Sequence, residues 1–140
     1  MEPARVTPPD LRAIEAELIA RKPIFHRPEF GTTRADFERM TDPGFWEVGA
    51  SGRRYSRDFI IDTLVARHAA PHDDPWETRD FCCQRLADGL YLLTYTLAQG
   101  ARITRRSTLW RRAGDDWAIV FHQGTIVADE HPATGTGTAT

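Results

Sequence analysis

The chain has 140 residues, of which 41% are hydrophobic and 27% charged, and its formal net charge at pH 7 is −2. A chain of this size and composition is expected to fold as a single globular domain. So small a net charge gives no electrostatic argument for a nucleic acid or an anionic membrane as partner. No stretch approaches the roughly 20 apolar residues of a membrane-spanning helix, and no charged start leads into an apolar signal core. We therefore expect a cytoplasmic protein.

The first helix is predicted within residues 7–23, TPPDLRAIEAELIARKP. Its apolar residues recur on one stripe, and the two prolines suit a first helical turn. Thr7 is expected to cap the helix, because a hydroxyl there can accept a hydrogen bond from the first backbone N–H groups. Residues 1–7 are expected to be a loose N-terminus.

Two more helices and a short strand are predicted before residue 70. The second helix begins after Thr33, its expected cap, and ends before Pro43, since proline and glycine together break a helix. Residues 45–49, FWEVG, alternate between apolar and polar side chains and are predicted to form a strand. Ser56 is the expected cap of the third helix, at residues 57–68.

The second half of the chain is a run of predicted strands. Asp88-Gly89 is a strong two-residue hairpin signal, Gly100 marks the next reversal, and residues 113–116, AGDD, mark the last. Three helices followed by four antiparallel strands predict an α+β fold in which the helices cover one face of a curved sheet. The domain is expected to span residues 8–127, followed by a disordered, low-complexity tail at 128–140.

Hairpin geometry assigns the strand residues to two faces, if Ala87 opposes Leu90 and Arg112 opposes Trp117. The predicted core face carries Leu86, Tyr91, Leu93, Tyr95, Leu97, Trp110, Ile119 and Phe121. The other face is mixed and carries Arg85, Thr94, Thr96, Arg105, Ser107 and His122, with Leu92, Leu109 and Val120 among them. A single β-bulge would reverse every assignment beyond it.

Several polar side chains fall on the predicted core face. They are Tyr95, Arg106 and Gln123, with Asp80, Cys82 and Gln84 farther along. A buried guanidinium without a partner is very costly, so Arg106 needs a carboxylate, water or an anionic ligand. Glu47, in the early strand, is the carboxylate expected to pair with it. A structural Arg–Glu pair, a ligand-lined cavity and catalysis by these groups all remain open.

The cysteines and histidines do not indicate a metal or a cofactor. Cys82 and Cys83 would point to opposite faces of a strand, so free thiols are a better prediction than a strained disulfide. Residues 68–74 hold two histidines and two aspartates, but loop residues beside prolines are usually solvated rather than ligands. We expect no cofactor and no metal site.

Two segments carry a family resemblance. DPGFWEVGASGRRYSRDFIIDTL (42–64) and RRSTLWRRAGDDWAIVFHQGT (105–125) resemble the nuclear transport factor 2-like superfamily, which has the SnoaL/ketosteroid-isomerase-like fold. More narrowly, they resemble a bacterial branch catalogued as a domain of unknown function. The recurring pattern is an acidic-aromatic strand, an SGR turn, a helix, and a strand ending in HQGT. The resemblance covers about residues 8–126. It implies a cone-shaped fold with a cavity between the concave sheet and the first helix, and a homodimer formed through the sheet.

The resemblance implies three functional hypotheses, because a fold alone does not fix chemistry. Relatives include ketosteroid isomerases, polyketide cyclases, small dehydratases and the non-catalytic association domain of a calmodulin-dependent kinase. The first hypothesis is a small-molecule-binding domain whose pocket suits an acidic or carbonyl ligand. Its expected ligand-binding residues are Glu47, Tyr95, Arg106, Trp110 and Gln123.

The second hypothesis is an isomerase, cyclase or dehydratase acting on a carbonyl compound in the same pocket. Its catalytic candidates are Glu47 as base, Tyr95 or Arg106 as oxyanion donor, and His122. The third is a non-catalytic dimerisation module. A strongly shifted pKa in the pocket would favour the second, and a cavity plugged by aromatic residues such as Trp46 and Phe59 would favour the third.

Overall fold

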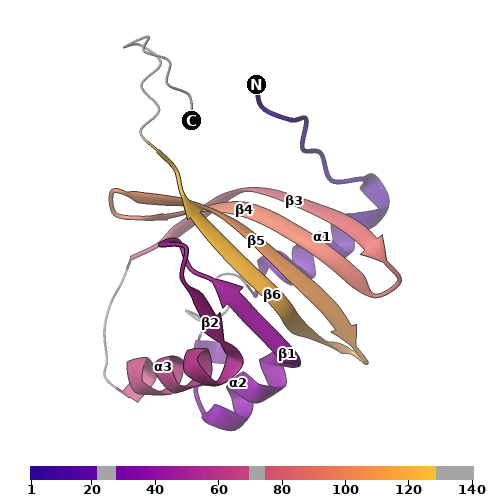
Figure 1. Ribbon diagram of the computed structural model, residues 1–140. Coiled ribbons are helices and arrows are strands. Elements are labelled where there is room, and N and C mark those ends of the chain that lie inside the picture. The colour runs from indigo at the N-terminus through magenta and orange to yellow at the C-terminus, as the bar shows by residue number, and fades with distance from the viewer. Residues whose placement is uncertain (22–27, 70–74, 129–140) are drawn as a thin grey trace.

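The structure is a computed structural model that describes residues 1–21, 28–69 and 75–128 of the chain. Figure 1 shows how the helices and strands of the described residues are arranged. In chain order these elements are the 3₁₀ turn η1 (Pro9–Leu11), α1 (Arg12–Ile19), the 3₁₀ turn η3 (Pro28–Phe30), α2 (Arg34–Met40), β1 (Thr41–Val48), β2 (Arg54–Ser56), α3 (Arg57–Ala69), β3 (Glu77–Ala87), β4 (Leu90–Gln99), β5 (Arg102–Ala113) and β6 (Asp116–Ile126).

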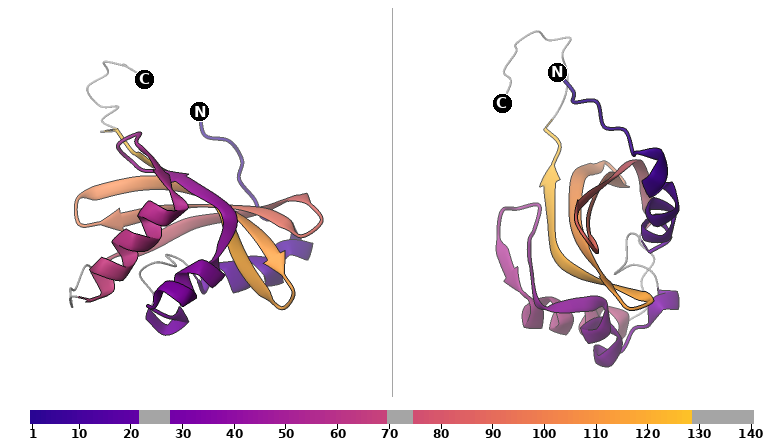
Figure 2. Two further views of the ribbon diagram at one scale, coloured as in Figure 1. Left: turned by 60° about the horizontal axis from the view of Figure 1, so that its bottom comes forward. Right: turned by 90° about the vertical axis from the view of Figure 1, so that its right-hand side faces the viewer.

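The strands form one mixed sheet in the order β2-β1-β6-β5-β4-β3. β1 runs parallel to β6, and the other neighbours are antiparallel. Figure 2 shows that the sheet is strongly curved, with α1 beside β3 at one end and α2 and α3 beside β1 at the other. We call the helix-covered side the concave face and the opposite side the outer face. The predicted α+β class, with three helices against a curved sheet, is confirmed.

Two of the three predicted caps are confirmed. Thr33 forms a capping box with Asp36: its hydroxyl accepts from the Asp36 N–H, and the Asp36 carboxylate accepts from the Thr33 N–H. These bonds lower the pKa of Asp36 to about 2. The Ser56 hydroxyl accepts from the N–H of Phe59 at 3.1 Å and so caps α3. Both caps follow from short-range geometry that the sequence specifies.

The predicted Thr7 cap is wrong. Pro8 precedes the first turn and Pro9 begins it, and neither proline has an N–H to offer a capping group. The Thr7 hydroxyl instead donates to Glu15 at 2.6 Å and accepts from the backbone N–H of Cys83 at 3.0 Å. Thr7 therefore ties the N-terminal segment to the outermost strand of the sheet.

The first strand is longer than predicted, because α2 ends at Met40 and β1 begins at once at Thr41. The pairing of β1 with β6 is irregular between Thr41 and Trp46. Pro43 falls in this irregular stretch, where a missing N–H breaks no regular ladder bond. Pro43 therefore lies within β1, after the helix has already ended at Met40.

A bulge between β3 and β4 moves Leu86 out of the predicted core. Ala87 pairs with Leu90 as expected, but Arg85 pairs with Tyr91, so Leu86 is an extra residue. Its side chain is 52% exposed. The prediction that Leu86 belongs to the core is wrong, because one inserted residue reverses the alternation of side chains.

The same displacement changes the rest of β3. Cys83 pairs with Leu93 and is fully buried in the core. A pairing without a bulge would place Cys82 and Gln84 on the core face instead. Gln84 is exposed, and Cys82 is buried on the other side of the strand. A second irregularity follows at Asp80, which has a φ of 69° and lies exposed. Both cysteines are free, as predicted.

A third bulge lies between β5 and β6. Trp110 pairs with Ile119 as predicted, but Leu109 pairs with Phe121, so Val120 is the extra residue. Every assignment beyond Val120 is therefore reversed. Phe121 lies half-buried on the outer face rather than in the core.

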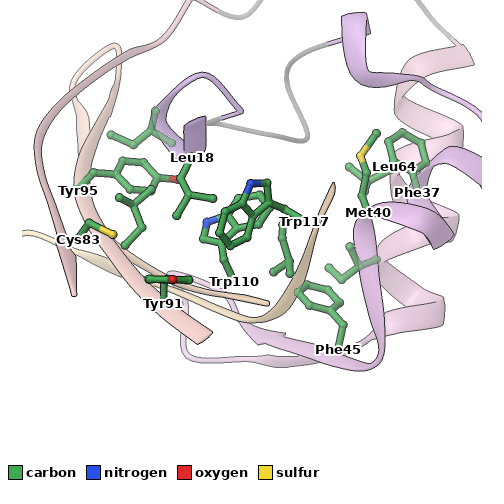
Figure 3. Packing of buried hydrophobic residues seen from close by; sticks show 14 of the residues in the cluster. Leu18, Phe37, Met40, Phe45, Leu64, Cys83, Tyr91, Tyr95, Trp110 and Trp117 are labelled. Atoms are coloured by element: carbon green, nitrogen blue, oxygen red, sulfur yellow. The ribbon is translucent and has the colours of Figure 1, made fainter. Parts of the chain in front are cut away.

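The core lies between the concave face and the helices. Trp110 of β5 and Trp117 of β6 are 0% and 1% exposed, and Figure 3 shows them in the middle of the buried side chains. The surrounding labelled residues are Leu18, Phe37, Met40, Phe45, Leu64, Cys83, Tyr91 and Tyr95. Among the described residues, no helix has the length and apolar character needed to cross a bilayer.

Candidate functional site

The polar side chains of the concave face gather around Arg106 of β5. β4 and β5 pair without interruption, and Tyr95 lies directly opposite Arg106. The prediction that these two residues share a face is confirmed. The Arg106 Nε–H donates to the Thr104 hydroxyl at 2.9 Å. Burial lowers the pKa of Arg106 below its usual value, and the positive charge of Arg102 acts in the same direction.

His122 completes a chain of hydrogen bonds with Arg106. Its Nε2 lies 3.1 Å from Nη1 of Arg106, and its Nδ1 lies 2.8 Å from the hydroxyl of Thr108. A guanidinium can only donate, so Nε2 must accept and Nδ1 must carry the proton. His122, which is 6% exposed, is therefore held as the neutral Nδ1–H tautomer.

Glu47 reaches this cluster from β1, where it pairs directly with His122 of β6. Its negative charge raises the pKa values of both Arg106 and Tyr95, which places the three groups within electrostatic reach of one another. Among the described residues, however, Arg106 has no carboxylate within ion-pair distance. The expected direct Glu47–Arg106 pair is therefore not formed.

Tyr95 lies at the buried back of the cluster. Burial raises the pKa of its phenol well above the usual value, Arg106 opposes this shift, and Glu47 adds to it. The ring stacks on Phe81 with a centroid distance of 5.1 Å. Tyr95 is thus a fixed, protonated phenol, which can donate a hydrogen bond but cannot act as a base at neutral pH.

Two of the predicted site residues lie on the opposite face from the one expected. The bulge at Val120 turns His122 inward and leaves Gln123 exposed on the outer face. Gln123 is therefore removed from the concave site, and His122 takes its place. Sequence reasoning overlooks Thr104 and Thr108, although both lie two residues from Arg106 on the same strand and must share its face.

Gly124 follows His122 on the concave side and provides the room that Arg106 occupies. A Cβ atom at Gly124 would lie 3.1 Å from Nε and 3.2 Å from Cζ of Arg106. The sequence predicts that this glycine permits a close approach or a bend. The structure identifies the group that approaches as the guanidinium.

Two aromatic residues that could have plugged a cavity do not do so. Trp46 is 43% exposed and its ring lies 4.8 Å from that of Phe121 on the outer face. Phe59 is 52% exposed and stacks on Tyr55. Trp110, by contrast, is fully buried, so it forms part of the packed floor rather than an open wall.

Among the described residues, no group of three histidine, cysteine or acidic side chains comes together as a metal site would require. His68 lies 5.7 Å from the ring of Phe37. The rest of the histidine- and aspartate-containing loop at 70–74 lies outside the described residues.

No family model and no curated protein matches the chain. Several solved structures do match it. The chain is similar to a protein with a cystatin-like fold from Caulobacter vibrioides, at 18% identity over 89% of this chain and 94% of the other, with a TM-score of 0.65. A candidate ketosteroid isomerase from Parabacteroides distasonis matches at 15% identity over 91% and 98%, with a TM-score of 0.62.

The CamKII hub homology domain from Chlamydamonas reinhardtii matches at 15% identity over 81% of this chain and 98% of that domain, with a TM-score of 0.62. Further matches include NTF2-like proteins and a DUF3225 protein of unknown function. Identities this low establish the fold and not the activity. The chain has the nuclear transport factor 2-like fold that its two sequence segments predict.

Proposed function

We propose that the protein is a small-molecule-binding domain whose concave face recognises an acidic or carbonyl ligand through Arg106. The observation that supports this is a half-buried guanidinium whose hydrogen-bond partners are two neutral groups, Thr104 and His122. Burying a positive charge is unfavourable unless an anion compensates it. The charge of Glu47 acts on Arg106 without a direct ion pair, so a ligand carboxylate or a polarised carbonyl would complete the site.

The other concave residues have supporting roles in this proposal. Glu47 and Arg106 are partly exposed and can meet a ligand, while Tyr95 and Trp110 are buried behind them. A small number of fixed polar groups against an apolar wall is the usual composition of a ligand site. We place the protein in the cytoplasm as part of the proposal, because its cysteines are free.

The test is a pair of variants at adjacent positions of β5. Arg106→Leu removes the charge from the concave face, and Arg105→Leu removes one from the outer face. Native mass spectrometry of the purified protein would first reveal any co-purifying ligand, and calorimetry would then measure the binding of benzoate, with benzyl alcohol as the neutral comparison. We expect Arg106→Leu to weaken benzoate binding at least about tenfold, and Arg105→Leu to leave this concave-site binding unchanged. A folded Arg106→Leu protein that binds benzoate as well as the parent would overturn the proposal.

A catalytic function is the second candidate, and the raised pKa of Tyr95 favours it. A phenol that stays protonated can donate to a developing enolate oxygen, and Glu47 could remove a proton next to the carbonyl. Exchange of the α-hydrogens of cyclohexanone in D₂O, followed by NMR, tests this. Activity that is lost in Glu47→Gln and Tyr95→Phe, but kept in a Glu38→Gln control at an exposed position, would support it.

Association of two copies through the outer face is the third candidate. One row across the sheet consists of Leu92, Leu109, Phe121 and Trp46, each paired with the next, and all four are at least partly exposed. A row of exposed apolar side chains is typical of an interaction surface. The likeness to a hub homology domain adds support. Analytical ultracentrifugation should show a dimer that Leu109→Glu dissociates and that Leu86→Glu, at an exposed position on β3, does not.

A further inference from the structure

A second concentration of arginines lies at the end of the sheet away from the apolar row, around the β4–β5 turn. A groove of about 450 Å³ opens there. It is lined by Arg79, Arg102 and Arg105 together with Ala101, Ile103, Ile126, Val127 and Ala128. The strands bring these residues together from β3, the β4–β5 turn, β5 and the end of β6, so the groove exists only in the folded sheet.

The strand register explains how the arginines meet. Arg79 pairs with Thr96, and Thr96 pairs with Arg105, so the two arginines flank one threonine on the outer face. In the next outer row, the carbonyl of Ile103 accepts from the N–H of Val127 at 3.0 Å. Arg102 pairs with Gln99 and Ile126 pairs with Thr104, so Arg102 and Ile126 belong to the concave side, and the groove includes residues of both faces at the end of the sheet.

The positive charge of the groove is only partly compensated. Arg105 donates to the Thr96 hydroxyl at 2.7 Å and to the carboxylate of Asp80 at 3.4 Å. Arg79 and Arg102 are exposed, and within the described ranges neither forms an ion pair. The positive charge of Arg102 also lowers the pKa of Arg106. Two guanidiniums are therefore available to an incoming anion.

The apolar side of the groove distinguishes it from a simple basic patch. Ile126 is 51% exposed, and Ile103 and Val127 are partly exposed beside it. Aliphatic side chains next to unpaired guanidiniums fit a ligand that is charged at one end and apolar at the other, because each part then meets its complement. An inorganic ion or a neutral lipid would satisfy only one side.

We propose that this groove at the end of the sheet is a second binding site, distinct from the cluster around Arg106, for a small carboxylic acid with an aliphatic body. Arg79 and Arg102 hold the carboxylate, while Ile103, Ile126 and Val127 cover the aliphatic part. The groove begins two outer rows away from the apolar row that contains Leu109 and Phe121. Ligand binding here is therefore compatible with association through that row.

The experiment uses octanoate as the probe on the full chain, with calorimetry for affinity and ¹H–¹⁵N NMR for location. The Arg79→Ala/Arg102→Ala double variant removes the two unpaired charges. The matched control is Arg53→Ala/Arg54→Ala, which removes two exposed arginines at the start of β2, one just before the strand and one at its first residue. We expect octanoate to shift the amide resonances of Gly100, Ala101 and Val127. We also expect the double variant to lose roughly tenfold in affinity at this site, and the control to change less than about twofold.

Three outcomes would overturn the proposal. The first is equal octanoate affinity in the double variant and the parent. The second is a set of shifts confined to concave residues such as His122 and Gly124 and abolished by Arg106→Leu, because octanoate would then bind only the concave site. The third is equally strong binding of acetate or of octanol, since either would show that only one side of the groove matters. The substituted arginines are exposed, so circular dichroism should confirm that every variant folds.

Discussion

Arg105 and Arg106 are neighbours in β5 and have opposite surroundings. Arg105 points to the outer face, where it meets the carboxylate of Asp80, which also pairs with Arg5 at 3.7 Å. Arg106 points to the concave face, where its hydrogen-bond partners are the neutral Thr104 and His122. The alternation of a strand thus places one arginine in a solvated ion-pair network and the next in a partly desolvated cluster.

This difference shows why the concave face is the better candidate for ligand recognition by a single charged residue. Exposed ion pairs contribute little free energy, because water and salt screen them. A desolvated charge interacts more strongly with whatever approaches it. Matched substitutions on the two faces should therefore differ in size, and the following four pairs test that expectation from the largest effect to the smallest.

The largest difference is expected between two tryptophans. Trp110→Ala would leave a large cavity in the core and should lower the free energy of unfolding by about 3–5 kcal/mol. Trp46→Ala removes a half-exposed ring from the outer face and should cost about 1 kcal/mol or less. Urea denaturation followed by circular dichroism measures both. If the two variants lost equal free energy of unfolding, the outer face around Trp46 would have to be covered as completely as the concave face around Trp110.

The second pair concerns pH and the adjacent cysteines. Burial raises the pKa of the Cys83 thiol from 9.0 to about 11. Above pH 9 the unfolded chain releases the proton while the folded chain keeps it, so stability should fall by up to about 1.4 kcal/mol per pH unit between pH 9 and pH 11. Cys83→Ala should remove the fall between pH 9 and pH 10 and leave only the part above pH 10 that the raised pKa of Tyr95 contributes, whereas Cys82→Ala should keep the slope of the parent. Because Tyr95 is present in both variants, unchanged slopes in both would exclude Cys83 as the source.

The third pair compares two threonines. Thr108→Val removes the acceptor for Nδ1–H of His122 and should cost about 1–3 kcal/mol, because the buried donor is left unsatisfied. Thr94→Val removes a partner of Arg5 at the partly exposed outer face and should cost under about 1 kcal/mol. The ¹⁵N shifts of the His122 ring should report loss of the single tautomer in the first variant alone. A ring that keeps one tautomer without Thr108 would show that other contacts orient it.

The smallest difference is expected between two glycines. In Gly124→Ala the new methyl group would lie 3.1 Å from Nε of Arg106, so the guanidinium must move slightly. In Gly44→Ala it would lie 3.4 Å from Asp42, which is an ordinary contact. We expect a loss of about 1 kcal/mol or less for Gly124→Ala, with a shifted Arg106 Nε–H resonance that Gly44→Ala leaves in place. An unmoved Arg106 Nε–H resonance in Gly124→Ala would mean that the backbone of β6, and not the Arg106 guanidinium, moves to make room for the methyl group.

The local signals in the sequence were sufficient for most of the fold. The caps at Thr33 and Ser56 and the turn at Asp88-Gly89 are as predicted, because each depends on residues within a few positions of one another. The Tyr95–Arg106 pairing is also correct, since the β4–β5 hairpin has no bulge and counting from its turn is reliable.

The sequence by itself therefore determined the α+β class, the order of elements and the position of Arg106 on the concave face. Tertiary structure alone decided that His122 rather than Gln123 joins it, because the bulge at Val120 reverses the strand beyond it. It also decided that Glu47 acts on Arg106 without a direct ion pair, and that Arg79 meets Arg105 across β4. Bulges and pairings between distant strands depend on how the whole sheet packs and twists, and no short-range pattern encodes them.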